Sequence, residues 1–366
     1  MSTAQAPVRV PFSAVADRGN LIEKTMGYKP NNTSTIDLQR TGYMAALSGV
    51  ATFTFTTIAG TVGTVKPSTG IPAPYSAFKR IRLYSNQQTS YVDVDMFGLF
   101  LWNLVQDQQD MRNLRTSFDA ADNGARIYNV PQSLAASTTY QVTFPIRLRP
   151  QLGDKDLLSL ILLEGRGTMY VDLQFNDVTT ALYNFSAGGI DPASVTFAFT
   201  PEIDTFMVPT DPTITPDLSP VKILRQYNDP FVAAGTDKFF PTNGGTELRL
   251  LMYYLDNNGN RVSTQYMRNY RLKFGGIITP EAGSVQNLVY TNCRDLGFAL
   301  PTGVICFDFM RGAGNSSLLP SLRDSIRLRD AQDLVVEVDF DPATPNMGAA
   351  GQRIVIVEEL RDVSAH

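Results

Sequence analysis

Hydrophobic and polar residues alternate over several short stretches of the chain. Residues 51–57 read Ala-Thr-Phe-Thr-Phe-Thr-Thr, which places Phe53 and Phe55 on one face and threonines on the other. This period of two residues predicts a β-strand with one buried face. Similar alternating or apolar stretches predict strands at 78–84, 91–95, 139–149, 168–176, 194–207, 247–255, 270–274, 303–311, 333–341 and 353–360.

Two stretches have the composition of helices instead. The apolar block 96–105 follows Asp95, a residue type that caps helices, and we expect a helix over 96–110 that packs against one end of a sheet. A second helical stretch is expected at 281–292. The apolar residues 157–163 predict a short helix or a turn.

The strand pattern of the first half of the chain recurs in the second half. Phe144 matches Phe307 and Phe175 matches Phe340, so that the matched residues lie 163 and 165 positions apart. The predicted helices and the intervening segments recur in the same order. A repeat of this length lies far outside the roughly 20–50-residue periods of solenoids and propellers. We therefore predict an all-β chain of two tandem eight-stranded jelly rolls with short flanking helices.

Prolines indicate where one module ends and the next begins. Residues 209–220 include four prolines, which exclude a central strand or a helix. We expect an N-terminal arm at 1–34, a first jelly roll at 35–208, a Pro-rich linker at 209–220 and a second jelly roll at 221–366.

The arm carries scattered apolar residues and more basic than acidic groups. Its prolines prevent one long helix, although 13–26 could form a short one capped by Ser13. Two interpretations stay open: a terminus packed on its own domain, or an arm that contacts a neighbouring subunit or a membrane surface. The residues expected at such a contact are Arg9, Val10, Phe12, Val15, Arg18, Ile22, Lys24 and Lys29.

Composition narrows the classes of function. The 366 residues suffice for two domains with their own cores. The net charge of −4 and the lack of a basic run argue against direct, sequence-specific binding of nucleic acid. The first residues lack the pattern of a signal peptide, which predicts a product that initially stays in the cytoplasm. No stretch has the roughly 20 apolar residues of a membrane-spanning helix.

Candidate chemistry is sparse. The only histidine is His366, so Ser-His-Asp triads and His-ligated metals are not expected. Residues 256–260 resemble the start of a calcium loop, but Met267 stands where the loop needs a glutamate, and a hairpin turn is the better interpretation. Cys293 and Cys306 are expected to be buried thiols rather than a disulfide. We expect no cofactor and no metal.

Pairs of carboxylates could in principle serve a glycosidase. Each pair lies in an alternating strand or at a strand end, where an acidic residue ordinarily faces solvent, so we expect no catalytic residues. The pairs considered are Asp93 with Asp95, Asp172 with Glu337, and Glu358 with Glu359.

Three stretches, 78–84, 168–175 and 300–309, occur in the order in which a known viral family places its strands. On these stretches the chain resembles the double jelly-roll major capsid proteins of tailless icosahedral viruses, especially tectivirus-like bacteriophages with an internal membrane. The resemblance spans 36–363 and is one of architecture and pattern. The long segments 111–138 and 226–246 would then be loops that project outward.

The resemblance implies a structural protein rather than an enzyme. Its jelly rolls would stand perpendicular to the capsid surface, and three chains would form a pseudo-hexagonal capsomer. Implied partners are two further copies of the chain, neighbouring capsomers, minor capsid or vertex proteins, and an internal lipid membrane. The protein would assemble in the host cytoplasm and reside in the virion capsid.

Two other functions compete with this interpretation. One is a double jelly-roll carbohydrate-binding protein or glycan-processing enzyme. Such proteins usually act outside the cell, and the single tryptophan, Trp102, lies in an apolar helix rather than in a predicted sugar site. The other is a different virion β protein, such as a vertex, spike or tail component.

Overall fold

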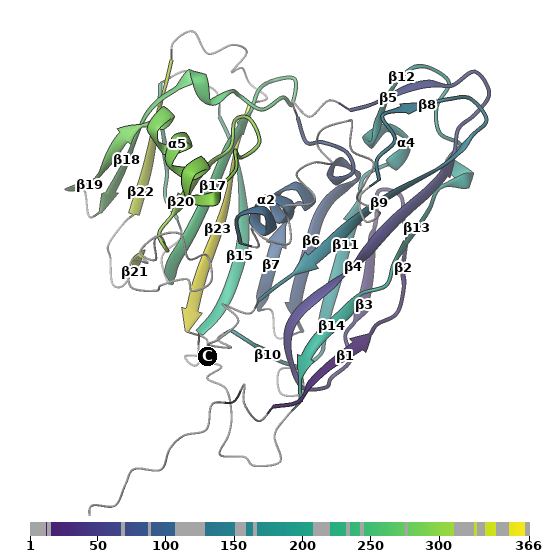
Figure 1. Cartoon of the computed structure of the whole chain (residues 1–366), viewed down its shortest axis with the longest axis horizontal. Helices are drawn as coiled ribbons and strands as arrows, with labels where there is room; N and C mark the ends of the chain where they lie inside the picture. Colours follow the sequence, from purple (N-terminus) through teal and green to yellow (C-terminus); the bar gives the residue numbers. More distant parts are fainter. Residues whose placement is uncertain are drawn as a thin grey trace, which may run out of the picture.

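The computed structural model describes most of the chain, namely Phe12 and residues 16–66, 70–86, 89–106, 129–150, 159–163, 167–207, 220–231, 235–241, 245–274, 277–310, 326–327, 334–341 and 351–362. Strands dominate this part and build two sandwiches that stand side by side (Figure 1). We call the eight main strands of each sandwich B to I in chain order, because both sandwiches pair their strands in the same way.

The first sandwich is built from the first half of the chain. One of its sheets has the order B-I-D-G, with β1 (Arg18–Ile22), β14 (Glu202–Phe206), β4 (Tyr43–Thr56) and β9 (Thr139–Leu148). The facing sheet has the order C-H-E-F, with β3 (Thr33–Asp37), β11 (Met169–Phe175), β6 (Phe78–Ser85) and β7 (Ser90–Val94). The first sheet also includes the short strands β2 (Met26–Gly27), β10 (Ile161–Leu162) and β13 (Thr196–Phe199).

The second sandwich repeats both orders. Its B-I-D-G sheet contains β15 (Pro220–Pro230), β23 (Gln352–Asp362), β17 (Thr246–Leu255) and β20 (Ile305–Asp308), and β21 (Ile326–Arg327) pairs with the start of β17. Its C-H-E-F sheet contains β16 (Thr236–Phe239), β22 (Leu334–Phe340), β18 (Met267–Phe274) and β19 (Ile277–Ser284). These are the strand orders of a jelly roll, so the predicted all-β pair of eight-stranded jelly rolls is confirmed.

Each jelly roll carries a helix directly after its F strand. These helices are α2 (Met96–Gln106) and α5 (Val285–Leu296), and a single turn, α4 (Val178–Ala181), lies in the first jelly roll. A small sheet of β12 (Tyr183–Ala187), β5 (Val62–Val65) and β8 (Ser133–Leu134) stands at one end of the first jelly roll, away from the end of β23 (Figure 1). Within the described ranges, no helix has the length and apolar character needed to span a bilayer.

The core of the first jelly roll is aromatic. Phe53 on β4 is fully buried, and aromatic rings from both sheets surround it. Their centroids lie 4.7 to 6.3 Å from that of Phe53, and they belong to Tyr28, Phe78, Phe144, Phe175 and Phe197. The period of two predicted from the sequence therefore points Phe53 and Phe55 into the sandwich.

The two jelly rolls share one sheet. The F strand of the first, β7, pairs in parallel with the B strand of the second, β15, with Val92 opposite Leu224 and Asp93 opposite Arg225. This pairing continues the C-H-E-F sheet of the first jelly roll into the B-I-D-G sheet of the second. The described part of the chain thus forms one connected body rather than two sandwiches on a string.

The N-terminal residues differ from the expectation of a short helix over 13–26. From Arg18 onward the chain is extended, and β1 pairs with β14 over all five of its residues. β2 pairs with β13 in the same sheet. The helix prediction is wrong over 18–26 because partners distant in sequence supply the backbone hydrogen bonds, which a local pattern does not show.

Three other segments also differ from expectation. Residues 226–246, expected as a projecting loop, include the end of β15 and all of β16. Residues 281–284 belong to β19, so the second helix begins only at Val285, after its cap Ser284. The helix or turn expected over 157–163 contains β10, and its first two residues lie outside the described part.

The expected loop over 111–138 is only partly described. Its residues 129–138 contain β8, and the remainder lies outside the described residues, as do 208–219 of the Pro-rich linker. The domain boundaries therefore stay a prediction.

Candidate assembly surface

The junction between the jelly rolls is organised by the start of α2. Asp95 caps the helix, because its Oδ1 accepts a hydrogen bond of 2.5 Å from the backbone N–H of Gly98. Gln226 of β15 clamps the same residue: its Nε2 donates to Asp95 Oδ2 at 2.7 Å, and its Oε1 accepts from the Asp95 N–H at 3.0 Å. Burial raises the pKa of Asp95, and these hydrogen bonds oppose the rise.

Helix α2 fills the space between the two jelly rolls. Every residue from Met96 to Val105 is buried. The ring of Phe97 lies 5.6 Å from that of Tyr253, and Lys222 Nζ lies 4.7 Å from the centroid of Trp102. A Cβ on Gly98 would lie only 2.7 Å from Gln226 Oε1, so glycine allows this close approach.

Strand β17 has a continuous run of apolar residues because both of its faces are buried at this junction. Leu250, Met252 and Tyr254 belong to the core of the second jelly roll. The intervening residues Leu251 and Tyr253 join the core that continues into the first jelly roll. A strand with buried residues on both faces reads as a continuous apolar run rather than an alternation.

Replacing Gln226 by Ala is expected to lower the free energy of unfolding by about 1–3 kcal/mol, because buried Asp95 loses both hydrogen bonds from that side chain. Urea unfolding measures the loss, with Gln265→Ala at an exposed position as the control. Equal midpoints for both variants would show that this clamp does not stabilise the junction.

Large apolar side chains reach the surface at several places in the described part. Tyr290 on α5 and Ile22 on β1 are the most exposed, at 68% and 65%. The others exposed by at least 39% are Val50, Ile58, Val62, Met207 and Phe240. Exposed apolar side chains of this kind are candidates for contacts with other subunits.

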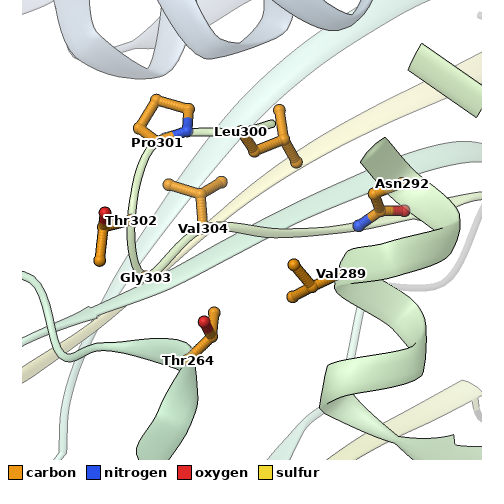
Figure 2. A pocket seen from close by; sticks show the side chains of 8 residues that line it. All are labelled: Thr264, Val289, Asn292, Leu300, Pro301, Thr302, Gly303 and Val304. Carbon is orange, nitrogen blue, oxygen red and sulfur yellow. The ribbon is translucent and has the colours of Figure 1, made fainter. Parts of the chain in front are cut away.

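A small cavity lies between α5 and the loop before β20. Figure 2 shows Val289 and Asn292 on the helix facing this loop. The cavity measures about 40 Å³, and its lining residues are Thr264, Val289, Asn292, Leu300, Pro301, Thr302, Gly303 and Val304. Binding sites for small organic ligands usually measure roughly 300–1,000 Å³, so this cavity is too small for a sugar unit.

The predicted arm contacts divide into packed and exposed residues. Phe12 is buried, with its ring 5.4 Å from that of Tyr43. Arg18 forms a 2.9 Å ion pair with Asp204, whereas Ile22 is exposed. Lys24 Nζ lies 3.9 Å from Asp37, and Lys29 is exposed. The remaining members, Arg9, Val10 and Val15, lie outside the described residues.

The carboxylate pairs considered from the sequence are bound by basic or polar partners of the chain. Asp93 forms an ion pair with Arg80, and Asp95 is the helix cap. Asp172 and Glu337 lie in different jelly rolls, where Thr35 donates to the first at 2.6 Å and Lys273 to the second at 2.7 Å. In the described ranges, no three His, Cys, Asp or Glu side chains are arranged to hold a metal ion.

The sequence interpretation missed a buried ionic cluster in the second jelly roll. Glu358 and Glu359 were expected to face solvent, but each is 1% exposed. Glu358 Oε2 accepts from Arg249 at 2.9 Å, and Glu358 Oε1 lies 3.7 Å from Lys222 Nζ. Glu359 Oε1 lies 2.8 Å from Arg361 Nε. The sequence signals were Arg361, two residues after Glu359 on the same strand, and basic residues at matching positions of the partner strands, which can be recognised only once the strand pairing is known.

A buried carboxyl of the same cluster has no hydrogen-bond partner among the residues that the structure describes. Glu247 on β17 is fully buried and lies opposite Glu359 on β23. Burial, together with the charge of Glu359, raises the pKa of Glu247 to about 8, although Arg361 counteracts the rise. Glu247 therefore carries a proton at neutral pH.

The predicted turn at 256–260 and the two cysteines are also described by the structure. Residues 256–260 form the expected turn, in which Asp256 Oδ1 accepts from the N–H groups of Asn258 and Asn260 at 2.8 Å. Cys306 is buried and Cys293 is half-buried, and both are thiols.

Comparison with known proteins gives structural matches only. No family model matches the chain, and no curated protein matches its sequence. Among solved structures, the MCP of STIV, the Sulfolobus Turreted Icosahedral Virus, superposes with a TM-score of 0.66 at 13% identity, covering 96% of this chain and 100% of that one.

Two further structures match over similar lengths. The major capsid protein of bacteriophage PM2 has a TM-score of 0.55 at 13% identity, covering 96% of this chain and 99% of its own. The Faustovirus major capsid protein has a TM-score of 0.61 at 10% identity, covering 99% and 92%. The chain therefore has the double jelly-roll fold seen in these viral major capsid proteins.

Proposed function

We propose that the chain is a major capsid protein whose trimers form pseudo-hexagonal capsomers of an icosahedral shell around an internal membrane and the genome. The observation that carries this proposal is the side-by-side pair of jelly rolls with identical strand order. Three such chains present six similar units, which suits near-hexagonal tiling. The fold shared with the capsid proteins of STIV, PM2 and Faustovirus supports the proposal.

We propose an orientation from the ends of the described strands. The start of β1 and the end of β23 lie toward one end of the molecule, and the small β12-β5-β8 sheet lies toward the other (Figure 1). In this proposal the former end faces the shell interior, where residues of the 1–34 arm contact lipid or a neighbouring subunit. Neighbouring capsomers and minor capsid or vertex proteins are the further partners, and the role is structural rather than enzymatic.

The molar mass of the purified protein tests the proposal. Light scattering after size exclusion is expected to give about 121 kDa, three times the chain mass of 40.3 kDa. A monomer of about 40 kDa that persists at high protein concentration would contradict the proposal. A glycan-binding and hydrolase screen would then test the carbohydrate alternative.

A further inference from the structure

Helices α2 and α5 occupy equivalent positions in the two jelly rolls. Each follows an F strand and has a side-chain cap, since Asp95 accepts from the N–H of Gly98 and Ser284 accepts from the N–H of Asn287. The residue numbers of these matched pairs differ by 189. The same difference relates the strands before the helices, where Arg82 lies opposite Asp93 and Arg271 lies opposite Ala282. The two helices can therefore be compared residue by residue.

The face of α2 that contacts the second jelly roll has an uncovered counterpart on α5. Phe97, Gly98 and Trp102 contact Tyr253, Gln226 and Lys222, respectively. Their counterparts are Gln286 and Asn287, which are exposed, and Thr291, which is half-buried. Tyr290 lies on this face, one turn after Gln286 and Asn287, and is 68% exposed. The opposite face of α5 packs on its own jelly roll through Val285, Leu288, Asn292 and Leu296.

The partner surface of α2 has an uncovered counterpart as well. Strand β15, the B strand of the second jelly roll, lies beside β7 and the start of α2. Its counterpart β1 is an edge strand of the first jelly roll, and β19, the counterpart of β7, is an edge strand of the second, among the described strands. An edge strand lacks a neighbouring strand on one side and can be covered by another chain there. Within the described part of a single chain, β7 and α2 contact β15, whereas the equivalent contact of β19 and α5 with β1 is not made.

Strand register identifies the residue of β1 that would meet α5. In the second jelly roll, Phe307 lies opposite Leu250, and Leu250 lies opposite Val357. In the first, the matched Phe144 lies opposite Ala51, and Ala51 lies opposite Phe199. Val357 and Phe199 are therefore equivalent positions.

The same count continues for three residues, along β23 in the second jelly roll and from the end of β13 to the start of β14 in the first, where β13 and β14 pair with β4 in one register. In the second jelly roll this count ends at Leu360, which lies opposite Lys222. In the first it ends at Glu202, which lies opposite Ile22. Ile22 is therefore the counterpart of Lys222, the residue that covers Trp102. The two most exposed large apolar side chains of the described part, Tyr290 and Ile22, thus fall on the two halves of one repeated contact.

We infer that α5 of one chain packs on the β1 edge of a neighbouring copy, with Tyr290 beside Ile22, as α2 packs on β15 within each chain. This inference rests on the proposed capsomer and names its subunit interface. Three such contacts alternate with three internal junctions, so the head-to-tail arrangement closes into a ring of six jelly rolls. Gln286 and Thr291 replace the apolar Phe97 and Trp102, and Asn287 replaces Gly98. The contact between chains is therefore more polar than the junction within a chain, with Tyr290 as an aromatic anchor.

Cysteine cross-linking of the full chain tests this interface. The variant Ile22→Cys/Tyr290→Cys, with Cys293→Ser to remove the half-buried thiol of α5, is oxidised and run on a non-reducing gel. A covalent trimer of about 121 kDa, three times 40.3 kDa, is expected. The control pair Val62→Cys/Phe240→Cys is similarly exposed, at 56% and 57%, but lies on neither α5 nor β1, so it is expected to stay a single chain, as is each single variant.

Charge substitution gives a second readout. Ile22→Glu and Tyr290→Glu are each expected to raise the trimer dissociation constant at least 10-fold, because each places a carboxylate in the interface, whereas Phe240→Glu leaves the constant unchanged. Circular dichroism verifies that each variant is folded.

The outcomes separate the inference from the proposed function. A wild-type trimer in which the Ile22/Tyr290 pair does not cross-link, or cross-links no better than the control pair, would overturn the inference and leave the capsomer proposal intact. A wild-type protein that remains monomeric would overturn both. A trimer unaffected by either glutamate would also overturn the inference.

Discussion

Replacing Glu247 by Gln is expected to remove the loss of folding stability that this one carboxyl causes as pH rises from 4.5 to above 8. Glu247 is fully buried and lies opposite Glu359, and its two carboxylate oxygens have no hydrogen-bond partner in the described part of the chain. Burial, together with the charge of Glu359, raises its pKa from 4.5 to about 8. The carboxyl is therefore far harder to ionise in the folded protein than in the unfolded chain.

The direction of the pH effect follows from proton binding. Below pH 4.5 the carboxyl is protonated in both states, so it contributes no pH dependence. Between pH 4.5 and about 8 the unfolded chain releases this proton while the folded protein keeps it, and rising pH favours unfolding. Above pH 8 the full loss, about 5 kcal/mol at 1.36 kcal/mol per unit of pKa, is reached. A glutamine has no proton to lose and avoids this change.

Urea unfolding of the wild type and of Glu247→Gln at pH 5, 7 and 9 measures this difference. The stability of the variant relative to wild type is expected to increase steadily with pH, whereas the exposed control Glu202→Gln changes little. The neighbouring charged groups Lys222, Arg249, Asp308, Glu358, Glu359 and Arg361 are present in all three proteins. Parallel pH profiles for wild type and Glu247→Gln would contradict the account of this carboxyl.

Replacing Phe53 by Ala is expected to lower the free energy of unfolding by about 3–5 kcal/mol, the usual cost of truncating a fully buried phenylalanine. Phe53 contacts rings from both sheets of the first jelly roll, including Phe144 on the B-I-D-G sheet and Phe175 on the C-H-E-F sheet. Its removal leaves a cavity where the two sheets meet, and neighbouring rings held on paired strands cannot collapse into it.

The midpoint and slope of urea unfolding measure this effect, and Phe240→Ala serves as the control because Phe240 is 57% exposed. The control is expected to change stability by less than about 0.5 kcal/mol. A loss at Phe53 as small as that at Phe240 would mean that the aromatic cluster does not hold the two sheets together.

The local patterns of the sequence predicted much of the fold. Alternation identified the strand that holds Phe53, and the matching of Phe144 with Phe307 identified the repeat. Only one of the two helix caps was predicted correctly. Asp95 was expected to cap α2 and does so, whereas Ser284, the cap of α5, was expected to lie inside the helix. These features depend on residues close together in the chain, which a sequence displays directly.

Features that depend on distant partners were not predictable. Strand β1 looked like an arm because it pairs with β14, which lies at least 180 residues away in the sequence. Glu358 and Glu359 looked solvated because Arg249 and Lys222, which face Glu358, and Arg225, which lies 3.9 Å from Glu359, sit on partner strands at positions that only the strand register reveals. The candidate assembly surface, which pairs Ile22 with Tyr290, needs both the register and the exposed fractions of the two side chains.

Negative-stain class averages of the purified oligomer show the number and arrangement of its units, and so reveal whether three chains form one capsomer. We expect a hexagonal plate with six similar lobes around one centre, two from each of three chains. A particle with only two or four lobes, or single chains with two lobes and no closed ring, would contradict the proposed capsomer.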